Sequence, residues 1–113
     1  MLDPGTDADA SMYLIQLLLP LYDNDQQPQP RALFERVREE LVARFGGLTA
    51  YTRAPVSGLW QEDIEHTVRD DLVIYEVMAP TLDRIWWRRY RRLLERRFCQ
   101  ESLLIRAQET SRL

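Results

Sequence analysis

The chain has 113 residues, of which 45% are hydrophobic and 29% are charged, and its formal net charge at pH 7 is −3. This length holds one domain with one core, and the composition excludes a chain that is disordered throughout. Asp3, Asp7 and Asp9 account for the negative charge, so the remainder is near neutral and lacks the basic excess typical of nucleic-acid-binding proteins.

The sequence contains one cysteine, Cys99, and one histidine, His66. An intramolecular disulfide is therefore excluded, as is a Cys/His zinc site within one chain. We expect no metal and no cofactor. Neither a secretory signal nor a stretch of about 20 apolar residues is present. We expect a disordered acidic tail over 1–10, a single domain over 11–113, no membrane contact and a cytoplasmic location.

The first half of the chain predicts a strand, a helix and a second strand. Residues 11–22 form an apolar run that Pro20 and the turn-rich "DNDQQPQP" interrupt, which is typical of a buried strand. Residues 30–45 have helical periodicity, with Gly46 in place for the left-handed residue after the helix. Residues 48–54 alternate and are rich in Thr and Tyr, which favours a strand. The apolar positions of the helix are Phe34, Val37, Leu41 and Phe45.

The second half predicts a strand, a helix and a strand after a long connection over 56–69. Residues 71–79 are β-branched and aromatic, which indicates a strong strand. We expect Thr81 to cap a helix that runs to about Phe98, with Asp83 in its first turn. Residues 102–109 then form the last strand.

This order predicts an α+β, ferredoxin-like βαββαβ fold, in which two helices cover one face of a four-stranded antiparallel sheet. The strands over 11–22 and 71–79 are nevertheless apolar on both sides, whereas a sheet face open to water should alternate polar residues. We therefore expect a second copy of the chain to cover the open face, giving a homodimer through the sheet faces.

The whole chain resembles, in topology, the dimeric α+β barrel proteins, which are small bacterial proteins. The strings "FGGLT", "GLW", "RDD" and "YEV" resemble an uncharacterised bacterial family of this size. In the wider group the resemblance implies cofactor-independent monooxygenases, haem-degrading enzymes, chlorite-decomposing enzymes and stress-related proteins, with active sites commonly between sheet and helices. The haem-binding members use a proximal histidine, to which His66 has no evident correspondence.

The segment "RIWWRRYRRLLERRF" alternates arginines with aromatic residues, which is one pattern of nucleic-acid contact. On a helix its apolar side chains gather on one face, so we favour an amphipathic helix lying on the sheet. That face holds Leu82, Trp86, Tyr90, Leu93 and Leu94, with Trp87 and Phe98 at its margin and Arg84, Arg88, Arg91 and Arg92 opposite. Arg97 falls within the apolar stripe. We expect it to reach water at the helix end, the alternative being a pair with a carboxylate near a pocket.

Two sets of polar residues are candidate ligand-binding sites. In the ferredoxin-like strand order, Arg106, Gln16 and Glu76 form a row on the open sheet face, where they bind a ligand or pair across the dimer and fix its register. Trp60 and His66 lie in the long connection, where His66 would titrate near neutral pH. The sequence contains no Gly-rich phosphate loop, serine-triad signature or metal-spaced cluster.

The favoured function is therefore that of a homodimer that binds a small organic molecule in a cleft between sheet and helices. Whether the chain is an enzyme stays open. One alternative is a cofactor-independent monooxygenase acting on an aromatic substrate through Glu76 or His66. The other is a nucleic-acid-binding module that uses the arginines of the second helix.

Overall fold

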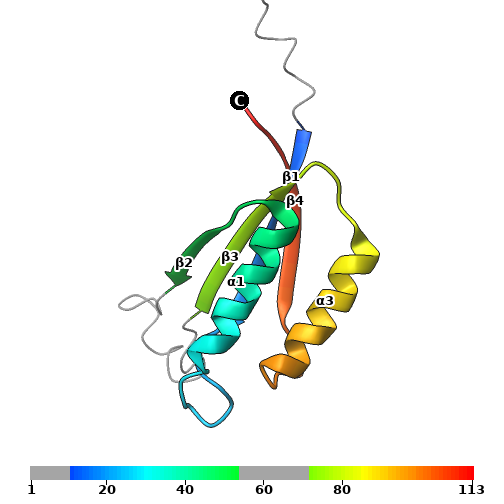
Figure 1. The fold of residues 1–113 in the computed structure, drawn as a ribbon. Coiled ribbons are helices and arrows are strands. Elements are labelled where there is room, and N and C mark those ends of the chain that lie inside the picture. The colour runs from blue at the N-terminus through cyan, green and yellow to red at the C-terminus, as the bar shows by residue number, and fades with distance from the viewer. Residues whose placement is uncertain (1–10, 54–71) are drawn as a thin grey trace, which may run out of the picture.

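The structure is a computed structural model, and it describes residues 11–53 and 72–113. Their elements follow the predicted βαββαβ order, so the α+β, ferredoxin-like fold is confirmed (Figure 1). The elements are β1 (Ser11–Pro20), α1 (Arg31–Phe45), β2 (Thr49–Arg53), β3 (Leu72–Ala79), α3 (Arg84–Arg97) and β4 (Leu104–Ser111). The connection with Trp60 and His66, and the tail over 1–10, lie outside the described residues.

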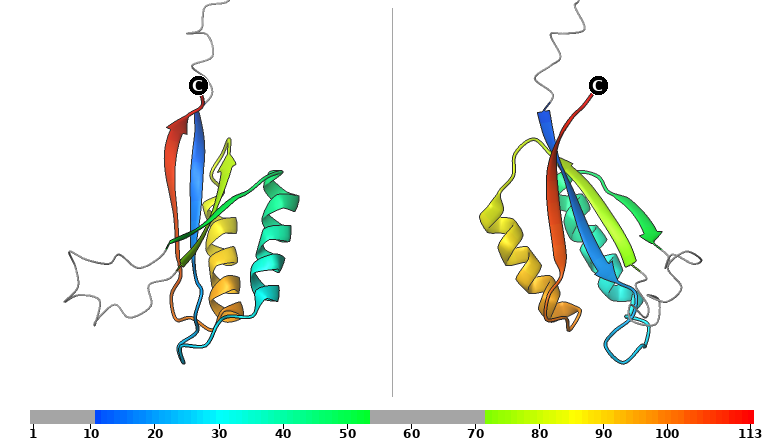
Figure 2. Two further views of the ribbon diagram at one scale, coloured as in Figure 1. Left: turned by 90° about the vertical axis from the view of Figure 1, so that its left-hand side faces the viewer. Right: turned by 180° about the vertical axis from the view of Figure 1, so that it is seen from behind.

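The four strands form one antiparallel sheet in the order β2-β3-β1-β4. Both α1 and α3 lie on the same side of this sheet, as the edge-on view shows (Figure 2). Strand β1 occupies an inner position, where Gln16 is opposite Glu76 of β3 and opposite Arg106 of β4. The predicted row of these three residues across the sheet is therefore confirmed.

The core fills the space between the sheet and the helices. Strands β1 and β3 each direct alternate residues into it, because successive side chains of a strand point to opposite faces. The buried core side chains include Ile15, Leu17 and Leu19 of β1, Tyr75, Val77 and Ala79 of β3, Val37 and Leu41 of α1, and Trp87, Tyr90 and Leu94 of α3.

Helix α1 ends as its sequence predicts. Gly46 adopts φ 81°, and its backbone N–H donates to the carbonyl of Val42 at 2.8 Å. A left-handed residue at this position satisfies a carbonyl group that the helix itself leaves unpaired, and glycine adopts that conformation without a steric cost.

The start and the buried side of α3 differ from the sequence prediction. Asp83, and not Thr81, caps the helix, because the Asp83 carboxylate accepts a hydrogen bond from the Trp86 backbone N–H at 3.0 Å. The buried stripe is rotated, so that Trp87 is 7% exposed while Leu93 is 37% exposed. Trp86 lies at the edge of the core, where the Arg44 guanidinium sits 4.1 Å from its ring centroid.

Helix α3 and strand β4 are joined by a short turn and diverge from it, so their far ends are well separated (Figure 1). In the turn the backbone N–H of Leu103 donates to the Glu95 carboxylate at 3.0 Å. Strand β4 begins at Leu104 and ends at Ser111, whereas the sequence predicted a strand over 102–109.

Candidate functional site

A groove of about 480 Å³ lies between α3 on one side and β1 and β4 on the other. Its apolar surface comes from both sides, since ring and aliphatic side chains of the strands face those of α3 and the turn before it. These apolar residues are Tyr13, Ile15, Leu82, Trp87 and Ile105. The groove is therefore a cleft between sheet and helix, and it has the size of known small-molecule sites.

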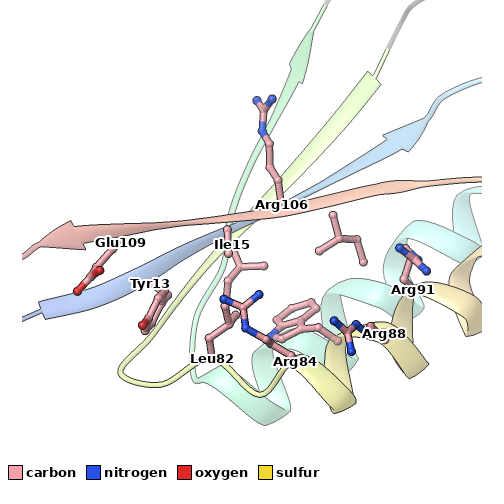
Figure 3. Close-up of a pocket in the computed structure, with 11 residues that line it drawn as sticks. Tyr13, Ile15, Leu82, Arg84, Arg88, Arg91, Arg106 and Glu109 are labelled. Atoms are coloured by element: carbon pink, nitrogen blue, oxygen red, sulfur yellow. The ribbon is translucent and has the colours of Figure 1, made fainter.

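The charged side chains of the groove are mainly arginines of α3. Arg84, Arg88 and Arg91 line the helix side, and Glu109 lines the strand side (Figure 3). The Glu109 carboxylate accepts a hydrogen bond from the Ser11 hydroxyl at 2.9 Å. Arg106 also borders the groove, but its guanidinium points away from α3 toward the open sheet face (Figure 3).

The three arginines differ in their partners. Within residues 11–53 and 72–113, neither Arg84 nor Arg88 forms an ion pair or a side-chain hydrogen bond. Arg91 has its Nε 3.6 Å from Glu95 Oε2, and this Nε is buried without a hydrogen-bond acceptor. The helix side of the groove thus carries positive charge that carboxylates of the described chain neutralise only in part.

The polar row on the open sheet face is hydrogen-bonded across all four strands. Arg106 Nε donates to Gln16 Oε1 at 2.7 Å, and Gln16 Nε2 donates to the Glu76 carboxylate. The Tyr51 hydroxyl of β2 donates to Glu76 Oε2 at 3.1 Å and accepts from Gln16 Nε2 at 3.1 Å. Desolvation, together with the hydrogen bond to Glu76, raises the pKa of Tyr51 above its ordinary value. The row is thus a connected network with a cation at one end and a carboxylate beside the other.

Arg97 lies at a third place, between the helices, and its predicted route to water is wrong. Its side chain is 7% exposed and donates two hydrogen bonds to Glu40 of α1, at 2.7 and 3.0 Å. The Tyr90 hydroxyl donates to Glu40 Oε1 at 2.9 Å. The alternative of a carboxylate partner is therefore the correct one, although this pair does not border the groove.

The predicted site residues thus separate into groups. Gln16, Glu76 and Arg106 lie together on the open face, Arg97 lies between the helices, and Trp60 and His66 fall outside the described residues. The sequence predicted the arginines of this helix as solvent-facing or as a nucleic-acid contact, and not as the lining of a groove. Their spacing at 84, 88 and 91 was visible, but that they line a groove beside β4 depends on how α3 lies against the sheet.

Among the described residues, no group of three or more His, Cys, Asp or Glu side chains is placed to hold a metal ion. No helix in the same part of the chain combines the length and apolarity needed to cross a membrane.

Comparison with known proteins identifies no family. No protein-family model matches the chain, and no curated protein matches its sequence. Among solved structures, the chain is similar to a phage SAM lyase in its apo state, with a TM-score of 0.42 and 13% sequence identity. The match covers 88% of this chain and 80% of that one. A likeness at this level carries no argument about function.

Proposed function

We propose that this protein is a homodimer that binds a small organic molecule in the groove between α3 and β4. The groove is the observation that carries the binding part of the proposal. Its volume of about 480 Å³ lies within the range of small-molecule sites, and it combines apolar side chains with a few charged groups. Trp87 and Ile105 supply apolar contact from opposite sides.

A substitution that fills the groove tests this part. Ala107 is exposed and lines the groove from β4, so Ala107→Trp should occupy the space without disturbing the core. We expect the wild type to bind the uncharged dye N-phenyl-1-naphthylamine, with a rise in dye fluorescence, and Ala107→Trp to lose that signal. Ala43→Trp, on the exposed side of α1, is the matched control and should bind as the wild type does. Equal dye binding by Ala107→Trp and the wild type would contradict the groove as the site.

The open sheet face supports the homodimer. Apolar side chains from three strands share it with the polar row, as the strand register places Leu14 beside Gln16 and Met78 beside Glu76. Leu18 and Ile74 lie on the same face but are already buried within the single chain, at 9% and 4% exposed. Met78 is 40% exposed, and Leu104 of β4 is 51% exposed. An apolar surface on a soluble subunit is typical of a protein interface, and a second copy covers it with an identical surface.

Sedimentation velocity at micromolar concentration tests the dimer. We expect the wild type to sediment as a dimer and Met78→Glu to sediment as a folded monomer, because the substitution buries an unpaired carboxylate in the interface. Val42→Glu replaces an exposed apolar residue of α1 and should leave the dimer intact. A stable wild-type monomer would overturn the dimer.

No specific observation supports either of the two alternative functions, the monooxygenase and the nucleic-acid-binding module. Glu76 lies on the open face and does not line the groove, so the groove offers a monooxygenase no carboxylate from that residue. For nucleic-acid binding, Arg84 and Arg88 are exposed, but together with Arg91 they line a groove that also has apolar side chains.

A further inference from the structure

We infer that the groove selects organic anions, namely molecules with an apolar body and one carboxylate, sulfonate or phosphate group held by Arg84 and Arg88. This inference rests on the proposed binding function of the groove and names its ligand class. It starts from the positions of the arginines. Residues four apart on a helix lie on the same side, about 6 Å apart along the axis, so one anionic group can contact both guanidinium groups.

The charges of Arg84 and Arg88 are available to a ligand. Elsewhere in the described chain, several arginines have carboxylate partners, such as Arg97 with Glu40 at 2.7 Å and Arg44 with Asp83 at 3.9 Å. Arg84 and Arg88 have none in that part of the chain. Guanidinium groups bind carboxylate and phosphate oxygens in pairs of parallel hydrogen bonds, which makes arginine well suited to such a head group.

The remaining groups of the groove leave the balance positive. Arg91 forms an ion pair with Glu95, with 3.6 Å between Nε and Oε2. On the opposite wall, the Glu109 carboxylate accepts a hydrogen bond from the Ser11 hydroxyl. Arg106 is directed to the other sheet face, where it donates to Gln16. The N-terminus of α3 is not the source of attraction, because the Asp83 carboxylate already caps it. The selectivity therefore depends on the side chains of Arg84 and Arg88.

The apolar side of the groove determines the rest of the ligand. Leu82, Trp87 and Ile105 line the groove together with the arginines and offer an apolar surface against which an aromatic or aliphatic body can pack. An inorganic anion would leave this surface wet, and an uncharged apolar molecule would leave the guanidinium groups without a partner. A molecule with both parts uses the whole groove.

Two dyes that differ by one charged group separate these contributions. The probe 8-anilinonaphthalene-1-sulfonate is N-phenyl-1-naphthylamine with an added sulfonate. We expect the double variant Arg84→Gln/Arg88→Gln to bind the sulfonate dye about tenfold more weakly and the uncharged dye within about twofold of the wild type. Arg89→Gln/Arg92→Gln removes the same charge from exposed positions that do not line the groove, and it should change neither affinity by more than about twofold.

The outcomes distinguish this inference from the proposed function. If Arg84→Gln/Arg88→Gln binds the sulfonate dye as tightly as the wild type, or if both double variants lose affinity equally, anion selection by these two residues is overturned. In either case the proposed function stands as long as Ala107→Trp still abolishes binding of the uncharged dye. If the wild type binds neither dye, both the function and the inference fall. Circular dichroism of each variant checks that it is folded.

Discussion

Arg97 of α3 and Glu40 of α1 join the two helices through a bidentate ion pair, with N–O distances of 2.7 and 3.0 Å. The pair lies beside the core, and Tyr90 adds a third hydrogen bond to the same carboxylate. A cation that is buried to this extent needs its partner, because an unpaired charge in the interior is strongly unfavourable.

We therefore expect Glu40→Gln to lower the free energy of unfolding by about 2 kcal/mol, since it leaves the Arg97 charge uncompensated. The estimate is below that for a fully buried pair because the Glu40 side chain is 33% exposed. Urea denaturation measures the change. Glu35→Gln breaks the exposed pair with Arg31, at 3.6 Å, and should cost less than about 0.5 kcal/mol. Equal losses in the free energy of unfolding for the two substitutions would show that the Arg97 pair stabilises the fold no more than an exposed ion pair does.

The same pair predicts a dependence of stability on acid pH. The hydrogen bond from Arg97 holds the pKa of Glu40 below its ordinary value of 4.5, although partial burial opposes this effect. As pH falls, the unfolded chain then binds the proton first. The stabilisation by Glu40 is therefore fully present above about pH 4.5 and is lost as the pH falls through the folded-state pKa. In urea denaturation from pH 6 to pH 3, the difference in free energy of unfolding between the wild type and Glu40→Gln should shrink. A difference that stays constant over this range would contradict the prediction.

At alkaline pH, Tyr90 should make the free energy of unfolding fall as the pH rises. Burial, and then the hydrogen bond to Glu40, raise the pKa of the Tyr90 hydroxyl above its ordinary value of 10.0. The unfolded chain ionises first as pH rises, so this contribution is present below about pH 10 and is lost above it. We expect Tyr90→Phe to lose less stability than the wild type between pH 9 and pH 11, as measured by urea denaturation. Tyr13→Phe serves as the comparison at another tyrosine.

The two glycines after α1 should respond differently to alanine. Gly46 has φ 81°, so Gly46→Ala should lower the free energy of unfolding by about 1 kcal/mol, although a Cβ there meets no atom within 4 Å. Gly47 also has open space around a Cβ, and its φ lies outside the positive range, so Gly47→Ala should be within about 0.5 kcal/mol of the wild type. Thermal and urea unfolding of both variants give this comparison, which isolates the backbone effect.

The polar row predicts how two copies are oriented in the proposed dimer. Arg106 and Glu76 flank Gln16 on the two strands beside β1. A two-fold axis parallel to β1 and passing over Gln16 places Arg106 against the partner's Glu76. An axis perpendicular to the strands places Arg106 against the partner's Arg106, which is unfavourable. The first orientation therefore follows from charge complementarity.

A charge exchange tests this orientation. Glu76→Arg alone and Arg106→Glu alone should each raise the dimer dissociation constant at least about 30-fold, or about 2 kcal/mol, because they bring like charges together. The double variant Glu76→Arg/Arg106→Glu restores opposite charges and should recover most of the affinity in sedimentation equilibrium. Failure of the double variant to recover would exclude the axis parallel to β1.

The sequence predicted features that depend on one element or on strand order, and it missed features that depend on how elements meet. The apolar runs over 11–22 and 71–79 predicted two strands that are apolar on both sides, and the fold's strand order placed Arg106, Gln16 and Glu76 in a row. Tyr51 was missed because its place beside Glu76 depends on the register between β2 and β3.

The environment of Arg97 and the groove also depend on how separate elements pack together, which the sequence did not predict. The helical period places Arg97 among apolar residues, but its partner, Glu40, is 57 residues away in sequence on another helix. The groove arises because α3 diverges from β4, and no residue pattern within α3 contains that angle. Trp60 and His66 stay predictions, since they lie outside the described residues.

The inner position of β1 has a consequence for synthesis of the chain. Ser11, at the start of β1, is opposite Ser111, at the end of β4, and Leu19 is opposite Val73. Strand β1 is therefore synthesised well before β3 and β4, the two strands that flank it, and it is apolar on both sides until they form. Contacts so distant in sequence slow folding and prolong the exposure of aggregation-prone segments. A nascent chain that stops before β4 should thus depend on chaperones to stay soluble.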